Sequence, residues 1–130
     1  MSDIAKQVHD KFKVFVGELA PDHTLGKLAE EVAGFAKHAG IAAKSIGVEY
    51  LESAKRLVVT LGYRPDEEPY PIRLHCVRMG KIETLSGDFS KLEAAMGEAS
   101  SKLRNIICHE LYLTEDQEFV MVFMTHEPNG

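Results

Sequence analysis

The segment 106–124 constrains the fold more than any other part of this chain. Two apolar runs, 106–113 and 119–124, flank the polar tetrad 114–117, a pattern typical of a β-hairpin with a short loop. The second run is apolar at every position. Because alternate side chains of a strand point to opposite faces, both faces of this arm have to be covered. The sequence therefore predicts a core strand that is buried on two sides, by a helix on one side and by another layer or a second subunit on the other.

The first forty residues carry apolar side chains at helical spacing. Positions 4, 8, 12, 15 and 19 are apolar, which predicts a helix that ends near Ala20, before Pro21. A second apolar stripe predicts a helix from Asp22 or Thr24 to Gly40, since glycine commonly ends a helix. Two helices joined by so few residues form a hairpin. We therefore expect an N-terminal helical hairpin.

The apolar period changes to two from Ser45 onward. Strands are predicted over 46–51 and 57–63, with a turn at 52–55 between them. An acidic, proline-rich loop at 64–71 precedes a strand over 72–79 and a short strand at 82–85. Residues 86–88 break the pattern and open a helix, which is followed by the final hairpin. The predicted fold is a single α+β domain over residues 1–130, with the N-terminal helical hairpin, a largely antiparallel sheet of five or six strands, and one helix inserted before the C-terminal β-hairpin.

Charge and composition argue against several classes of function. The chain has 15 Lys and Arg against 20 Asp and Glu, and its net charge of -5 repels nucleic-acid phosphates. No apolar run approaches the length of a membrane-spanning helix, and the first residues lack the apolar core of a signal peptide. The two cysteines lie in apolar strand patterns, which does not imply a disulfide framework. We expect a cytoplasmic protein with reduced thiols that binds neither nucleic acid nor a membrane.

Polar side chains on two predicted strands could line a ligand pocket. The strand over 72–79 carries Arg73, His75 and Arg78, and the strand over 106–113 carries Glu110 and Tyr112. If these side chains meet on one sheet face, they can line a pocket for an anion or a small ligand. Ion pairing between strands on a solvated face explains the same residues more simply, because nothing in the sequence fixes the strand register.

A transition-metal site is an alternative interpretation of the same strands. His75 and Cys76 mirror Cys108 and His109, and imidazole and thiolate are the ligands that zinc prefers. Adjacent residues of a strand point to opposite faces, however, so each pair can supply only one ligand to a given site. Buried thiols and a hydrogen-bonded imidazole are the simpler interpretation.

The sequence carries no motif for catalysis or for a cofactor. The glycines at 80 and 87 lack the spacing of either nucleotide-binding fingerprint and are more simply turns. The clustered carboxylates lie in loops without hydrophobic shelter, which suits solubility better than acid catalysis. A cysteine nucleophile is disfavoured by its apolar neighbours. We therefore expect no cofactor, and the sequence leans away from an enzyme.

The predicted order of helix, three strands, helix and two strands is similar to that of small acidic secretion chaperones. This resemblance is one of fold order alone, and it implies a dimeric, non-enzymatic protein; the extra N-terminal helix and the absence of a C-terminal helix depart from it. The leading hypothesis is a non-catalytic, cytosolic interaction or chaperone-like protein that forms a homodimer and has a protein partner. The alternative is a small-ligand or transition-metal binding protein that uses the polar residues of 72–79 and 106–113.

Overall fold

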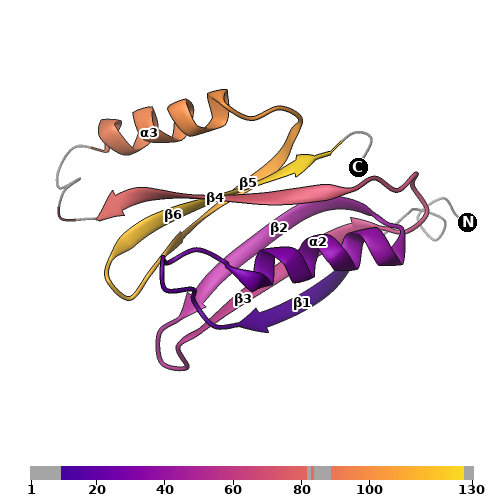
Figure 1. The fold of residues 1–130 in the computed structure, drawn as a ribbon, viewed down its shortest axis with the longest axis horizontal. Coiled ribbons are helices and arrows are strands. Elements are labelled where there is room, and N and C mark those ends of the chain that lie inside the picture. Colours follow the sequence, from indigo (N-terminus) through magenta and orange to yellow (C-terminus); the bar gives the residue numbers. More distant parts are fainter. Residues whose placement is uncertain (1–9, 82, 84–88, 128–130) are drawn as a thin grey trace, which may run out of the picture.

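The structure is a computed structural model that describes residues 10–81, 83 and 89–127. Figure 1 shows its helices and strands, and all strand pairs are antiparallel. In chain order they are β1 (Lys11–Gly17), α2 (Lys27–Ala39), β2 (Ala42–Leu51), β3 (Arg56–Arg64), β4 (Ile72–Lys81), α3 (Ser90–Ser101), β5 (Ile106–Leu113) and β6 (Glu118–His126).

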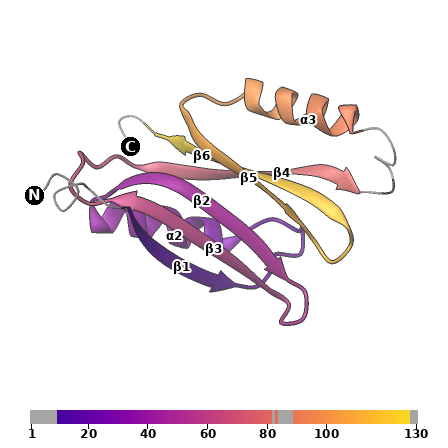
Figure 2. The same cartoon turned by 180° about the vertical axis from the view of Figure 1, so that it is seen from behind.

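The strands form two three-stranded sheets. Sheet A has the order β1-β3-β2, and sheet B has the order β4-β6-β5. The two sheets approach each other where β2 contacts β5, and α2 contacts β4 of one sheet and β1 of the other. Helix α3 lies on the far side of sheet B, and Figure 2 shows the two helices separated by the strands. Strand β6 is therefore the central strand of a sheet that has a packed layer on each face.

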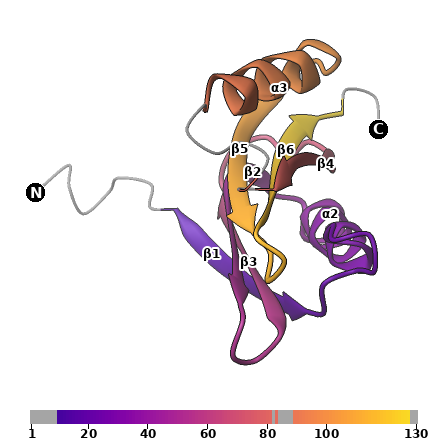
Figure 3. The same cartoon turned by 90° about the vertical axis from the view of Figure 1, so that its left-hand side faces the viewer.

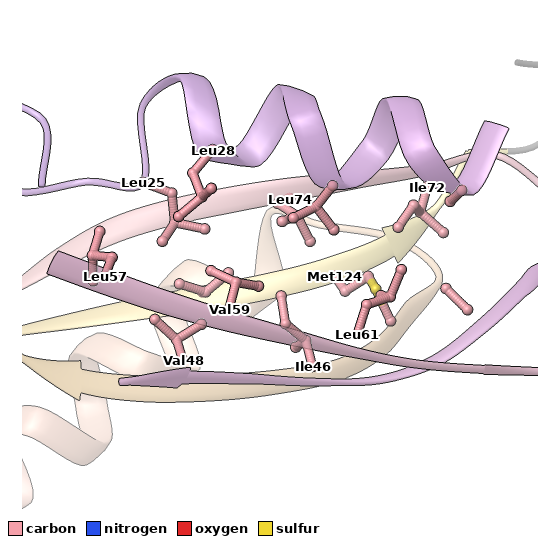
Figure 4. Packing of buried hydrophobic residues seen from close by; sticks show 14 of the residues in the cluster. Leu25, Leu28, Ile46, Val48, Leu57, Val59, Leu61, Ile72, Leu74 and Met124 are labelled. Carbon is pink, nitrogen blue, oxygen red and sulfur yellow. The ribbon is translucent and has the colours of Figure 1, made fainter. Parts of the chain in front are cut away.

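One face of β6 belongs to the larger hydrophobic core. Val120, Val122 and Met124 are fully buried and pack with α2 and with the inner face of sheet A. Figure 4 shows how side chains from α2, both sheets and the segment before α2 point into this core. The labelled members are Leu25, Leu28, Ile46, Val48, Leu57, Val59, Leu61, Ile72, Leu74 and Met124.

The opposite face of β6 belongs to a second, smaller core under α3. Met121 and Phe123 are buried there against Leu92 of α3 and Met79 of β4, and Phe119 is half-buried at the edge. The expectation that both faces of this strand are covered is thus confirmed. Both covers come from the same chain.

The predicted N-terminal helical hairpin is wrong. Residues 11–17 form the strand β1, which pairs with β3 from Lys11 opposite Tyr63 to Gly17 opposite Leu57. The helical spacing of Phe12 and Phe15 is incidental, because Lys-Phe-Lys-Val-Phe-Val is also rich in the β-branched and aromatic residues that favour strands. Pairing with β3 decides between the two patterns. The part of the predicted helix that falls on residues 1–9 lies outside the described residues.

The second predicted helix is present but begins later than expected. Asp22 accepts hydrogen bonds from the backbone N–H and the hydroxyl of Thr24, which holds a turn, and His23 has a φ of 68°. Helix α2 therefore starts at Lys27. Its predicted end is confirmed, because Gly40 caps it in the left-handed conformation with a φ of 61°.

The expectation of one sheet is also corrected, since the six strands of the described residues divide into two sheets of three. The predicted short strand at 82–85 falls mostly on residues 82 and 84–88, which lie outside the described residues. The helix predicted before the final hairpin is α3, and the hairpin itself is β5 and β6. Neither α2 nor α3 has the length and apolar composition needed to cross a bilayer.

Shortening a side chain under α3 tests the dependence of the fold on the second core. We expect Phe123→Ala to lower the free energy of unfolding by about 3–5 kcal/mol, because it removes a buried aromatic ring and leaves a cavity. Phe89→Ala is the matched control, since Phe89 is 57% exposed and should cost under about 0.5 kcal/mol. Chemical denaturation followed by circular dichroism measures both. Equal losses in the two variants would contradict the assignment of the core.

Candidate functional site

The outer face of sheet A, opposite α2, carries three exposed apolar side chains on its outermost strand. Phe12, Val14 and Val16 of β1 lie in one row, opposite Gly62, Thr60 and Val58 of β3. Figure 3 shows α2 on one side of sheet A, and the described residues place no helix on the other side. We call these three side chains the β1 row.

The β1 row is strongly exposed for its composition. Phe12 is 67% exposed, Val14 56% and Val16 58%. In the described part of the chain, no other strand carries more than one large apolar side chain in the exposed class. Single exposed apolar residues are normal on a protein surface, whereas a contiguous apolar patch is a candidate interaction site.

Small residues on β2 and β3 keep the rest of this face flat. A Cβ atom added to Gly62 would lie 3.2 Å from a ring carbon of Phe12 and would collide with the Ser45 hydroxyl, so the Phe12 ring rests directly over the Gly62 backbone. A Cβ atom at Gly47 would lie 2.6 Å from the Thr60 hydroxyl. Beside Phe12 and Val14, this face thus carries glycines and short polar side chains.

The structure does not bring the five predicted ligand-binding residues together. Arg73 and His75 lie opposite Thr125 and Phe123, on the face of sheet B that carries the second core. Arg78, Glu110 and Tyr112 are in register with even-numbered residues of β6, on the other face. A sheet therefore separates the two groups.

Four of these five side chains have partners within the fold, and one of them, Arg73, lies 3.5 Å from the carboxylate of Glu127. His75 is half-buried with its Nε2 atom 3.0 Å from the Thr125 hydroxyl, and desolvation lowers the pKa of its imidazole. The Tyr112 hydroxyl donates to the His23 carbonyl oxygen at 2.7 Å, and burial raises its pKa. Arg78 is paired with Glu118. A groove of about 500 Å³ between α3 and β4 follows residues 75–79 of β4, so it touches His75 and Arg78 although their side chains point to opposite faces of the sheet.

The four residues of the alternative metal site are also divided between the faces. Cys76 and Cys108 lie on the large-core face of sheet B, opposite Val122 and Met124, whereas His75 and His109 lie on the other face, both opposite Phe123. On each face, the β4 residue and the β5 residue are also separated by β6, which places them two strand spacings, about 10 Å, apart. Across the described ranges, no three His, Cys, Asp or Glu side chains are grouped so as to hold a metal ion.

Sequence reasoning missed a charged cluster at the start of β6. The carboxylate of Glu118, whose side chain is only 7% exposed, accepts hydrogen bonds from Arg78 at 3.0 Å. One Glu118 oxygen also lies 2.8 Å from Nδ1 of His23, and the other ring nitrogen lies 3.2 Å from Asp116. We call these four residues the Glu118 cluster. No local signal could have revealed it, because Glu118 is 95 positions from His23 and 40 from Arg78.

The Glu118 cluster links three segments of the fold through its charged side chains. Burial of Glu118 acts to raise its pKa, but the hydrogen bonds and charges of Arg78 and His23 outweigh burial, so its pKa lies below the usual value. The cluster fixes the segment before α2 to the β5–β6 hairpin and leaves its carboxylate saturated with donors.

Comparison with protein-family models, curated proteins and solved structures finds no match to this chain.

The lowered pKa of Glu118 predicts how its contribution to stability depends on pH. The folded state holds Glu118 ionised more strongly than the unfolded state does, so its stabilisation is present above the unfolded pKa and is lost as the pH falls through the folded pKa. We expect Glu118→Gln to cost on the order of 1–3 kcal/mol at about pH 7, and this difference from the wild type should shrink toward about pH 3.

The matched control for Glu118 is Glu98→Gln. Glu98 forms an exposed pair with Lys102 at 3.8 Å on α3, and its loss should change stability by under about 0.5 kcal/mol at any pH. Urea denaturation over a series of pH values gives both differences. A loss for Glu118→Gln that grows as the pH falls would contradict the assignment.

Both thiols should react slowly in the folded protein. Cys76 and Cys108 are free and half-buried, and burial raises the pKa of Cys76 and raises that of Cys108 to about 11. Because the thiolate is the reactive form, we expect native-state modification by an aromatic disulfide reagent to be at least about tenfold slower than in urea. Labelling at the rate of a free thiol would contradict this picture and reopen a redox or nucleophilic role.

Proposed function

We propose that this chain is a non-catalytic, chaperone-like interaction protein that acts as a homodimer in the cytosol. The observation that carries the proposal is the β1 row, three large apolar side chains in line on the outermost strand of sheet A and more than half exposed. Transfer of apolar surface out of water is worth roughly 25 cal/mol for each Å² that a partner covers. Covering a row of this kind with another surface therefore lowers the free energy of the system.

The proposal is non-catalytic because the side chains that could react are bonded within the fold or have an unfavourable pKa. The Glu118 carboxylate is bonded to Arg78 and His23, and His75 is bonded to Thr125. The raised thiol pKa of Cys108 disfavours a nucleophilic thiolate near neutral pH. Each of these groups has a structural use. The cytosolic setting is supported by the two cysteines, which lie free and half-buried in the fold.

The β1 row, rather than the two apolar faces of β6, is the reason for expecting a dimer. Burial of both faces of β6 is completed by α2, sheet A and α3 of the same chain, so a second subunit is not needed there. The need for a cover moves to the outer face of sheet A, where Phe12, Val14 and Val16 remain exposed. The homodimer is thus proposed through β1 rather than through the final hairpin.

A charge placed in the β1 row tests this proposal. Light scattering on the wild-type chain should report about twice the chain mass of 14.4 kDa. We expect Val14→Lys to shift the protein to the monomer, because it places a like charge in an apolar interface. Phe89→Lys is the matched control, since Phe89 is similarly exposed but lies at the start of α3, and it should leave the dimer intact.

The variants also need a check of folding. Val14 is exposed, so Val14→Lys should retain the circular dichroism spectrum of the wild type and should still unfold cooperatively, with a lower midpoint because the stabilisation from association is lost. A wild-type chain that is monomeric at every concentration contradicts the proposed homodimer. Dissociation by Phe89→Lys alone would place the interface at α3 instead.

A further inference from the structure

Strand β1 has a free backbone edge as well as an exposed apolar row. It pairs with β3 on one side only, and β1 is the outermost strand of sheet A in Figures 1 and 2. Along the other side, the described residues place no strand. Unpaired amides and carbonyls on such an edge are a template for another strand.

We propose that β1 pairs with β1 of a second copy of this chain, antiparallel, with Val14 on the two-fold axis. The inference rests on the proposed homodimer and specifies how it is built. The two copies of sheet A then form one continuous sheet, in the order β2-β3-β1-β1-β3-β2. A two-fold axis perpendicular to the sheet keeps both outer faces on the same side, so that the two β1 rows join into one apolar strip.

The sequence of β1 is complementary to itself in this register. Val14 lies opposite Val14 of the second copy, and Phe12 lies opposite Val16, so each apolar side chain of the row meets another. On the α2 side, Lys13 lies opposite Phe15. Lys13 already lies over an aromatic ring in the single chain, with its Nζ atom 5.7 Å from the ring centre of Phe35. A second aromatic neighbour suits its charge.

Both neighbouring registers that keep the apolar faces aligned are worse. Moving the axis to residue 13 places Lys13 directly opposite Lys13 and sets Asp10 against Val16. Moving the axis to residue 15 sets Phe12 against Glu18. A shift by a single partner position places the apolar row of one copy on the lysine face of the other. The charges of β1 thus select one register.

The acidic residues at the two ends of β1 already have cationic partners. In the proposed register Asp10 approaches Glu18 of the second copy, which would be repulsive for isolated carboxylates. Asp10, however, is paired with Arg64 at 2.6 Å, and Glu18 lies 3.6 Å from Arg56. Both arginines belong to β3, beside β1, so each strand end brings a compensating positive charge to the junction.

Cysteine cross-linking tests the register directly. We expect Val14→Cys in the full chain to form a disulfide-linked dimer under mild oxidation, because opposite residues of an antiparallel pair lie within disulfide reach. Phe12→Cys alone and Val16→Cys alone should cross-link poorly, since identical residues lie about 13 Å apart in this register. A mixture of these two variants should form the mixed disulfide.

Control variants distinguish failure of the β1–β1 pairing from failure of the proposed homodimer. Wild-type protein, which holds Cys76 and Cys108, and Phe89→Cys report background oxidation. Val14→Cys should cross-link at least about tenfold faster than Phe89→Cys, because pairing holds the two thiols at a millimolar effective concentration. A dimer by light scattering in which Val14→Cys is no faster than Phe89→Cys overturns the edge pairing but not the homodimer. A chain that remains a monomer overturns both and leaves the β1 row to a different protein.

Discussion

The arrangement of this protein depends on β6, a strand that is apolar on both faces. Val122 and Phe123 are neighbours in sequence, yet they lie in different hydrophobic cores because successive side chains of a strand point in opposite directions. A strand of this kind is stable only as the central strand of a sheet with a layer on each side. The order β4-β6-β5 supplies its two neighbours, and α2 with sheet A and α3 supply the two layers.

The Glu118 cluster solves a problem that this central strand creates at its first residue. A carboxylate at the start of a buried strand costs free energy unless donors surround it. Arg78 comes from the neighbouring strand, but His23 comes from the segment that leads into α2. Tyr112 holds the same segment through the carbonyl oxygen of His23. Satisfying one buried carboxylate therefore also positions α2 over the larger core.

The sequence was sufficient where a local pattern has one physical meaning. The final hairpin, the burial of both faces of β6 and the end of α2 at Gly40 follow from strand alternation and from the left-handed cap. It was insufficient for β1, whose apolar positions fit a helix as well as a strand until pairing with β3 decides. The candidate sites were limited in the same way, because the face on which His75 or Cys108 lies depends on the register with β6, which the sequence of either strand alone does not contain.

Strand β1, whose sequence pattern predicted a helix, also carries the proposed interaction surface, and one cause explains both. Among the described strands, β1 pairs with β3 alone. Its side chains on the outer face of sheet A therefore have few packing contacts within the described part of the chain. A strand whose only role was to close sheet A would gain nothing from Phe12, Val14 and Val16 on its exposed side, where polar residues would cost less. Because this side is apolar while Lys11 and Lys13 lie on the other, the alternation of β1 is matched to a cover that the described part of the chain does not provide.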